Sequence, residues 1–227
     1  MEHEVLYRQA YSLLKITLAR GESVCAEAGA MVSMSDTIDM QTAAKGGLFG
    51  ALKRSMLGGE SFFINTFHAR NEAGEVTFAP TLPGDITAVQ LAGKTIFAQS
   101  GAYIAATPDV AIDTKWGGAK TFFSREGLFL LRISGTGAVW LSSYGAIHQV
   151  PLAAGQTYTV DSGHMVAFDE TVRYAVRTVG GLKSTLFSGE GLVCDLTGPG
   201  TIMIQTRSAD AFLSWLIPQI PRDSNRR

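Results

Sequence analysis

Residues 93–106 read GKTIFAQSGAYIAA, and two other stretches share this pattern: GESVCAEAGAMVSM at 21–34 and GQTYTVDSGHMVAF at 155–168. Each has a glycine, five residues, an acid or amide, a small residue, a second glycine and an apolar pair. After Gly93, Ile96, Ala98 and Ser100 alternate with Phe97 and Gln99. This period of two residues predicts a β-strand. We expect the second glycines to need a positive φ or a close backbone approach; they are Gly29, Gly101 and Gly163.

A second block recurs between these stretches, as GESFFINTF, REGLFLLRI and GEGLVCDLT. It carries the repeated acids Glu60, Glu126 and Glu190. After each block the chain passes turn residues and returns as a strand, so hairpins are expected. The returning strands should place these residues in the core: Val76, Phe78, Val139, Leu141, Ile202 and Ile204. The order of these landmarks predicts three internal repeats, at about 1–80, 81–145 and 146–207.

These repeats predict a single all-β domain over residues 1–220, with approximate threefold pseudosymmetry. A small isolated sheet could not bury its apolar face alone, so the three units are expected to share one core. Helix is expected only near 48–57 and 209–217. The basic stretch 221–227 is expected to be a disordered tail.

Composition excludes several classes of protein. The chain has 227 residues, of which 46% are hydrophobic and 17% charged, enough for a globular core. Its net charge of −1 disfavours nucleic acid as a partner. Two cysteines, Cys25 and Cys194, do not make a disulfide framework. With neither a secretory signal nor a membrane-spanning apolar run, a cytoplasmic location is expected.

The stretch GGLFGALKRSMLGGESFFINTF at 46–67, with VTFAPTLPGDI downstream, resembles the altered-inheritance-of-mitochondria family. Its fungal members are linked to mitochondrial biogenesis and inner-membrane organisation, and its bacterial and archaeal members are soluble. The resemblance implies the fold of the tryptophan RNA-binding attenuation protein, a β-sandwich related to the double-stranded β-helix. The sequence has no mitochondrial presequence, so a mitochondrial location is not implied. The family supplies no catalytic residues to transfer.

No catalytic, metal or cofactor site is predicted. The histidines are scattered, and no H-x-H pair offers the clustered ligands of a cupin-type metal site; they are His3, His68, His148 and His164. Cys194 aligns with Ile64 and Leu130 and is interpreted as a small buried hydrophobe, whereas Cys25 stays undecided. The repeated glutamates could converge on a cation, but backbone hydrogen bonds at their own strands are favoured.

The segment GGLFGALKRSMLGG at 46–59 is the largest departure from the repeat. Helical spacing would place Leu48, Leu52 and Met56 on one face, with Phe49 beside them and Lys53 and Arg54 toward the flank. Three interpretations stay open: a plug for the β body, an oligomer or protein interface, and a contact with anionic headgroups. The C-terminal helix raises the same choice with Phe212, Leu213, Leu216 and Ile217.

The leading hypothesis is a non-catalytic scaffold or interaction protein that forms a homo-oligomer and has a peripheral membrane role. A small-ligand-binding module is the alternative, because proteins of the implied fold bind ligands between β units. An enzyme ranks last.

Overall fold

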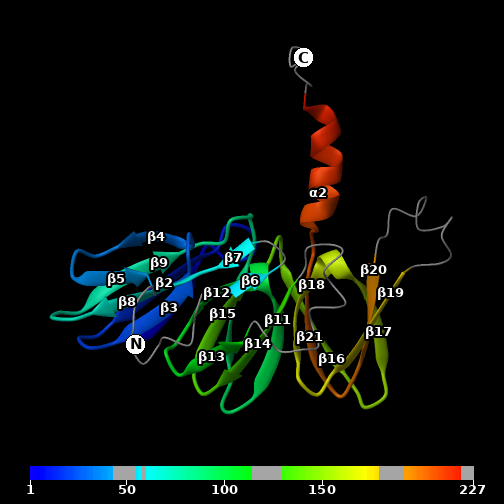
Figure 1. Cartoon of the computed structure of the whole chain (residues 1–227), viewed down its shortest axis with the longest axis horizontal. Helices are drawn as coiled ribbons and strands as arrows, with labels where there is room; N and C mark the ends of the chain where they lie inside the picture. The colour runs from blue at the N-terminus through cyan, green and yellow to red at the C-terminus, as the bar shows by residue number, and fades with distance from the viewer. Residues whose placement is uncertain (43–54, 58–59, 114–128, 179–191, 221–227) are drawn as a thin grey trace.

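The structure is a computed structural model, and it describes residues 1–42, 55–57, 60–113, 129–178 and 192–220. Regular structure within these ranges is almost entirely antiparallel β-sheet, which confirms the all-β class. The helix α2 (Ala209–Leu216) projects from the β body (Figure 1) and confirms the helix expected at 209–217. A short 3-10 turn, η3 (Ile217–Gln219), continues it.

The strands fall into three successive segments. The first contains β1 (Glu2–Leu6), β2 (Leu13–Leu18), β3 (Ser23–Glu27), β4 (Met31–Met34), β5 (Ile38–Thr42), β6 (Ser55–Leu57), β7 (Glu60–Phe62), β8 (Ile64–Ala69) and β9 (Gly74–Phe78). The second contains β10 (Ile86–Gln90), β11 (Thr95–Gln99), β12 (Tyr103–Ala106), β13 (Val110–Asp113), β14 (Leu130–Gly135) and β15 (Ala138–Ser142). The third contains β16 (Ile147–Leu152), β17 (Thr157–Asp161), β18 (Met165–Asp169), β19 (Arg173–Thr178), β20 (Leu192–Thr197) and β21 (Gly200–Gln205).

Each segment pairs its strands in the same way. In the second segment β15 lies between β10 and β12, and β14 pairs with β11 and β13. The first segment places β9 between β2 and β4, and β8 between β3 and β5. The third places β21 between β16 and β18, and β20 between β17 and β19. Every segment therefore contains two groups of three adjacent antiparallel strands.

Neighbouring segments join edge to edge. Strand β3 of the first segment pairs antiparallel with β12 of the second, and β11 of the second pairs with β18 of the third. These contacts create two six-stranded sheets, with orders β10-β15-β12-β3-β8-β5 and β13-β14-β11-β18-β21-β16. A four-stranded sheet, β1-β2-β9-β4, and a three-stranded sheet, β17-β20-β19, complete the row.

Three hydrophobic cores lie between these sheets. The first joins the four-stranded sheet to the first six-stranded sheet, with Phe78 and Trp140 among its residues. The second lies between the two six-stranded sheets and contains Tyr103, and the third, around Phe168, reaches the three-stranded sheet. Every residue of β12 and β15 is buried, because both faces of their sheet are covered. The body is thus a stack of sheets along the long axis (Figure 1).

The returning strands fill the core as predicted. Five of the six expected residues are buried, and Ile204 is half-buried and packs against the third core. Period-two alternation explains this success, because successive side chains of a strand point to opposite faces.

Two expectations about local structure were wrong. Residues 55–57, the end of the predicted helix at 48–57, form β6, which pairs with β7 through Met56 opposite Ser61. The two strands are separated by Gly58-Gly59, a dipeptide typical of two-residue hairpin loops. Residues 48–54 of that prediction lie outside the described residues.

The positive φ falls mainly on another glycine of the repeated pattern. Gly29 has a φ of +95°, as expected, but Gly101 and Gly163 lie in the 3-10 turns η1 (Ser100–Ala102) and η2 (Ser162–His164), without a positive φ. The first glycine of each stretch takes it instead: the φ values of Gly21, Gly93 and Gly155 are +85°, +83° and +77°. The tight turn before the strand therefore demands a positive φ in all three stretches, whereas the turn after it demands one only at Gly29. At Gly163 a close approach favours glycine instead, because an added Cβ would lie 2.6 Å from Ser208 Oγ.

Candidate functional site

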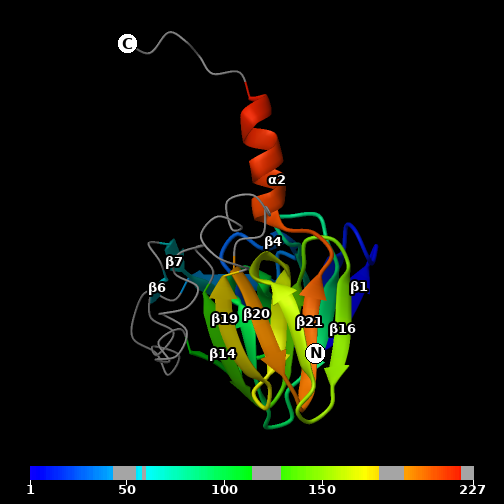
Figure 2. The same cartoon turned by 90° about the vertical axis from the view of Figure 1, so that its right-hand side faces the viewer.

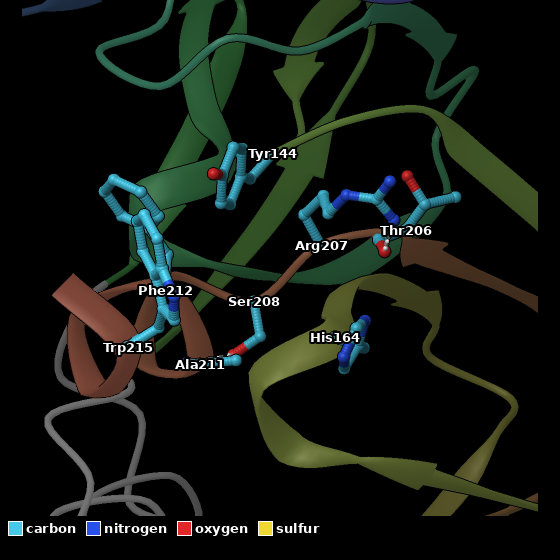
Figure 3. Close-up of a pocket in the computed structure, with 8 residues that line it drawn as sticks. All are labelled: Tyr144, His164, Thr206, Arg207, Ser208, Ala211, Phe212 and Trp215. Atoms are coloured by element: carbon cyan, nitrogen blue, oxygen red, sulfur yellow. Dashed lines mark hydrogen bonds between the residues drawn. The ribbon is translucent and has the colours of Figure 1, made fainter.

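A pocket of about 360 Å³ lies where α2 leaves the β body (Figure 3). Its lining comes from three parts of the chain: the end of the second segment, the η2 turn and the stretch after β21. The lining residues are Tyr144, His164, Thr206, Arg207, Ser208, Ala211, Phe212 and Trp215.

Gln205 fixes the polar side of this pocket. Its side-chain oxygen accepts from the Tyr144 backbone N–H at 2.8 Å, and its side-chain amide donates to the Gly163 carbonyl at 2.9 Å. The Gln205 carbonyl also accepts from His164 Nδ1 at 2.7 Å. Because a carbonyl can only accept, Nδ1 carries the proton, and Nε2 of the neutral ring is left as an acceptor.

Ser208 and aromatic side chains form the other side. Ser208 is the N-cap of α2, where its hydroxyl accepts from the Ala211 N–H at 3.4 Å. The Phe212 ring lies 6.3 Å from Tyr144, edge to face, and 6.1 Å from Trp215. Arg207 Nη1 donates to the Thr206 carbonyl, which leaves the exposed guanidinium with further donors. The pocket thus combines aromatic faces with a cation and an imidazole.

The surface of α2 beyond the pocket is apolar and open. None of its residues is buried, and Leu213 is 45% and Trp215 63% exposed. The following turn continues this surface with Ile217 at 59% and Ile220 at 54%. Helical spacing predicted an apolar face here, but only the structure shows that Phe212 contacts Tyr144 of the body while Leu213 and Ile217 of the same face are exposed.

A second group of ionisable side chains lies around β3. Burial raises the pKa of Glu27 to about 7 and also raises the pKa of the Cys25 thiol. Tyr103, fully buried, donates its hydroxyl to the Cys25 carbonyl at 3.2 Å, and burial raises its pKa well above 10.0. A buried thiol with a raised pKa is a poor nucleophile at neutral pH.

Cys194 is fully buried in the third core, as predicted, and burial raises its pKa to about 12. The predicted alignment of this residue was one position off. Cys194 lies opposite Val160 in its ladder, the place that Asn65 and Leu131 take opposite Ala26 and Ala98.

The predicted interface segment falls mostly outside the described residues. This holds for Leu48, Phe49, Leu52, Lys53 and Arg54, and also for Glu126 and Glu190 of the repeated acids. Met56 and Glu60 lie in β6 and β7, where the backbone alone is described. The favoured interpretation of the three glutamates, backbone hydrogen bonds at their own strands, therefore stays a prediction, and their convergence on a cation stays the alternative.

Sequence reasoning missed the pocket. It placed His164 opposite Ala30 and Ala102 in the repeats and treated it as an isolated histidine. The structure brings it beside Arg207 and the aromatic residues of α2. The available signal was that His164 is the polar exception at a position where the other stretches have alanine.

Within the described ranges, no group of three or more His, Cys, Asp or Glu side chains is arranged to hold a metal ion. None of the helices in those ranges has the length and apolar character needed to cross a membrane.

The fold and the site define an all-β protein of stacked antiparallel sheets that carries an exposed C-terminal helix with a pocket at its base. Residues 3–207 match the sequence model of a protein family, mitochondrial biogenesis AIM24. The chain belongs to this family, as its sequence resemblance predicted.

Two streptococcal proteins are similar to this chain over nearly its whole length. An uncharacterized protein of Streptococcus pyogenes serotype M6 is 30% identical over 223 residues, which cover 95% of this chain and 89% of the relative. The crystal structure of a Streptococcus pyogenes protein superposes with a TM-score of 0.78 at 29% identity. That match covers 96% of this chain and 99% of the other.

Proposed function

We propose that this protein is a non-catalytic interaction protein that attaches to a membrane surface through its C-terminal helix. The observation that carries the proposal is the exposure of α2 and the turn after it. Burying a large apolar side chain gains roughly 1.5–3 kcal/mol, so Leu213, Trp215, Ile217 and Ile220 offer a substantial gain to whatever covers them. Contiguous apolar surfaces of this kind mark protein or membrane contacts.

The residues present favour a lipid surface over a protein groove. Tryptophan prefers the boundary between headgroups and acyl chains, and Trp215 is the most exposed large side chain of α2. In the sequence, Arg222, Arg226 and Arg227 follow within a few residues and would attract anionic headgroups. A cytoplasmic protein with this contact would be peripheral to the membrane.

The test compares Leu213→Ser/Trp215→Ser with the wild type in sedimentation with vesicles of phosphatidylcholine and phosphatidylglycerol. Both side chains are exposed, so unfolding free energy should change by about 0.5 kcal/mol or less. Loss of their insertion should weaken vesicle binding at least about tenfold.

Tyr7→Ser, which removes a 72% exposed aromatic side chain far along the sequence from α2, is the matched control and should bind like the wild type. Equal vesicle binding by the double variant, or no binding by the wild type, would contradict attachment to lipid. The second outcome would point instead to a protein that covers α2.

A small-ligand-binding module is the second candidate, and the pocket at the base of α2 favours it. The aromatic rings of Phe212 and Trp215 and the guanidinium of Arg207 line the same pocket. The ring of an aromatic carboxylate would pack on the aromatic side chains, and its carboxylate would pair with Arg207. Stabilisation by benzoate that is lost in Arg207→Ala would support this candidate.

We also infer that the three segments are copies of one unit, in a sandwich like that of the tryptophan RNA-binding attenuation protein. The equivalent strand pairings support this inference. So does a register shift at the same place in each copy, at Met31/Ser33, Tyr103/Ala105 and Met165/Ala167. The backbone of 21–42, 93–113 and 155–176 is expected to superpose, except at the turn around Gly29.

A further inference from the structure

The row of sheets ends in two open strand edges. The three segments share six strands in the same chain order. At each boundary the second shared strand of one segment pairs with the third shared strand of the next: β3 pairs with β12, and β11 pairs with β18. Counted over the six strands that all three segments share, which leaves out β1, β6 and β7, the third strand of the first segment is β4 and the second strand of the last is β17. Both are terminal in their sheets, so within the described residues neither has a ladder partner on its outer side.

The side chains of β4 are exposed where their counterparts are buried. Val32 is 58% exposed, whereas Ile104 and Val166 at the matching places are 1% and 0% exposed. Met34 is 41% exposed, and its counterparts Ala106 and Phe168 are both 1% exposed.

The same contrast holds for β17. Tyr158 is 39% exposed, whereas Val24 and Ile96 at the matching places are 0% and 4% exposed. The terminal strands therefore keep apolar residues at positions that a neighbouring unit covers inside the chain.

The β4 edge lacks the charged residues and proline that protect many open edges, and the register shift that it carries at Met31/Ser33 is shared by β12 and β18, which pair on both sides. Natural sheets guard open edges with lysine, proline or inward-pointing charge. Residues 31–34, MVSM, contain no charged residue and no proline. An unguarded apolar edge of this kind is a template for another strand.

We propose that β4 of one copy of this protein pairs antiparallel with β17 of a second copy, with Ser33 opposite Val160 and Met34 opposite Thr159. The register follows from the internal boundary, where Ala105 lies opposite Ala26 and Ala106 opposite Cys25. The other boundary gives the same register, with Ala167 opposite Ala98 and Phe168 opposite Phe97. This interface goes beyond the proposed function and does not depend on it.

Pairing of these edges completes a sheet that already exists twice in the molecule. The merged order would be β1-β2-β9-β4-β17-β20-β19, whose last six strands follow the order of both internal six-stranded sheets. The two edges lie at opposite ends of the long axis (Figure 1), so a chain cannot pair with itself. The end carrying β19 and β20 faces the viewer in Figure 2. The contact is heterologous and builds either a ring or a filament.

Cysteine cross-linking tests the register. Met34→Cys and Thr159→Cys are made in separate chains, and the wild-type cysteines stay because both are buried. Under mild oxidation the mixture should form a disulfide-linked heterodimer, because directly opposite residues lie within disulfide reach. Thr157→Cys is the matched control: it is an exposed β17 residue two positions out of register and should cross-link at least tenfold less with Met34→Cys. The proposal is overturned if Met34→Cys cross-links equally well with Thr159→Cys and Thr157→Cys, or with neither of them.

Solution mass supplies a second measurement. The wild type should assemble beyond the 24.2 kDa monomer as its concentration rises, as measured by sedimentation velocity. Val32→Lys should stay folded, because the side chain is exposed in the single chain, and should weaken assembly at least tenfold. Tyr11→Lys, at a 75% exposed position, is the control and should assemble like the wild type.

A wild type that stays monomeric up to millimolar concentration, or a Val32→Lys variant that assembles normally, overturns the proposal. Leu213→Ser/Trp215→Ser should assemble like the wild type. Failure of the membrane contact and failure of this interface are therefore seen in different variants.

Discussion

Glu27 couples folding to pH near neutrality. It lies half-buried at the end of β3, and burial raises its pKa from 4.5 to about 7. Between these values the folded state holds a proton that the unfolded state has lost, so the stability that this group contributes is fully present below pH 4.5 and is lost as the pH rises through 7.

Glu27→Gln should remove this loss. From pH 5 to pH 8 the wild type should lose about 1–3 kcal/mol of unfolding free energy relative to the variant, since each pKa unit corresponds to about 1.4 kcal/mol. Urea melts at both pH values measure the difference. Parallel pH dependence in the two proteins would show that the carboxyl is solvated.

Asp85 anchors the turn between β1 and β2 to the start of β10. Its buried carboxylate accepts from Arg8 Nε at 3.3 Å and Nη2 at 3.2 Å, from the Ser12 hydroxyl at 3.0 Å and from the Ile86 N–H at 2.8 Å. Burial alone would raise its pKa, but these hydrogen bonds and one from the Gln9 N–H outweigh burial and lower it below 3.8. The stability that the ionised group contributes is present above pH 3.8 and is lost as the pH falls through the lowered pKa.

Asp85→Ala should cost about 2–4 kcal/mol at pH 7, because it leaves buried donors without an acceptor. The matched control is Asp39→Ala. Asp39 also pairs with an arginine, Arg70, at 2.7 Å, but the pair is about half exposed and should contribute less than about 1 kcal/mol. Denaturant melts measure both variants, and similar losses would contradict the anchoring role of Asp85.

Assembly and membrane attachment should reinforce each other in the whole molecule. A single α2 is only eight residues long, so one copy has modest affinity for a lipid surface. Each added copy brings another helix to the same surface, and linked contacts bind more tightly than single ones. The proposed strand interface would therefore make a weak contact effective.

The expected consequence is that Val32→Lys weakens vesicle binding about tenfold or more at concentrations where the wild type is assembled. Residue 32 lies on β4, in a different sheet from the strands that precede α2, so a direct effect on the helix is not expected. Dilution of the wild type below its assembly range should reproduce the loss. Unchanged binding by Val32→Lys would show that single copies attach independently.

Local patterns in the sequence determined the all-β class, the pairing of returning strands and the position of α2. Period-two alternation places Val76, Phe78 and Val139 in cores, because side-chain direction along a strand is set by the backbone itself. The apolar spacing of Phe212 and Leu213, bounded by Pro218, likewise specified a helix.

Contacts between distant residues decided what these patterns left open. Residues 55–57 fit the spacing of a predicted helix but pair with 60–62. His164 lines the same pocket as Tyr144 and Trp215 only because three separate parts of the chain converge.

The stretches that contain β4, β12 and β18 are alike in sequence, yet only the side chains of β4 are exposed throughout. The reason is that burial depends on whether another unit lies beside the strand. A strand's own residues specify its direction and its faces, whereas only the assembled sheets show which edge still has room for a neighbour.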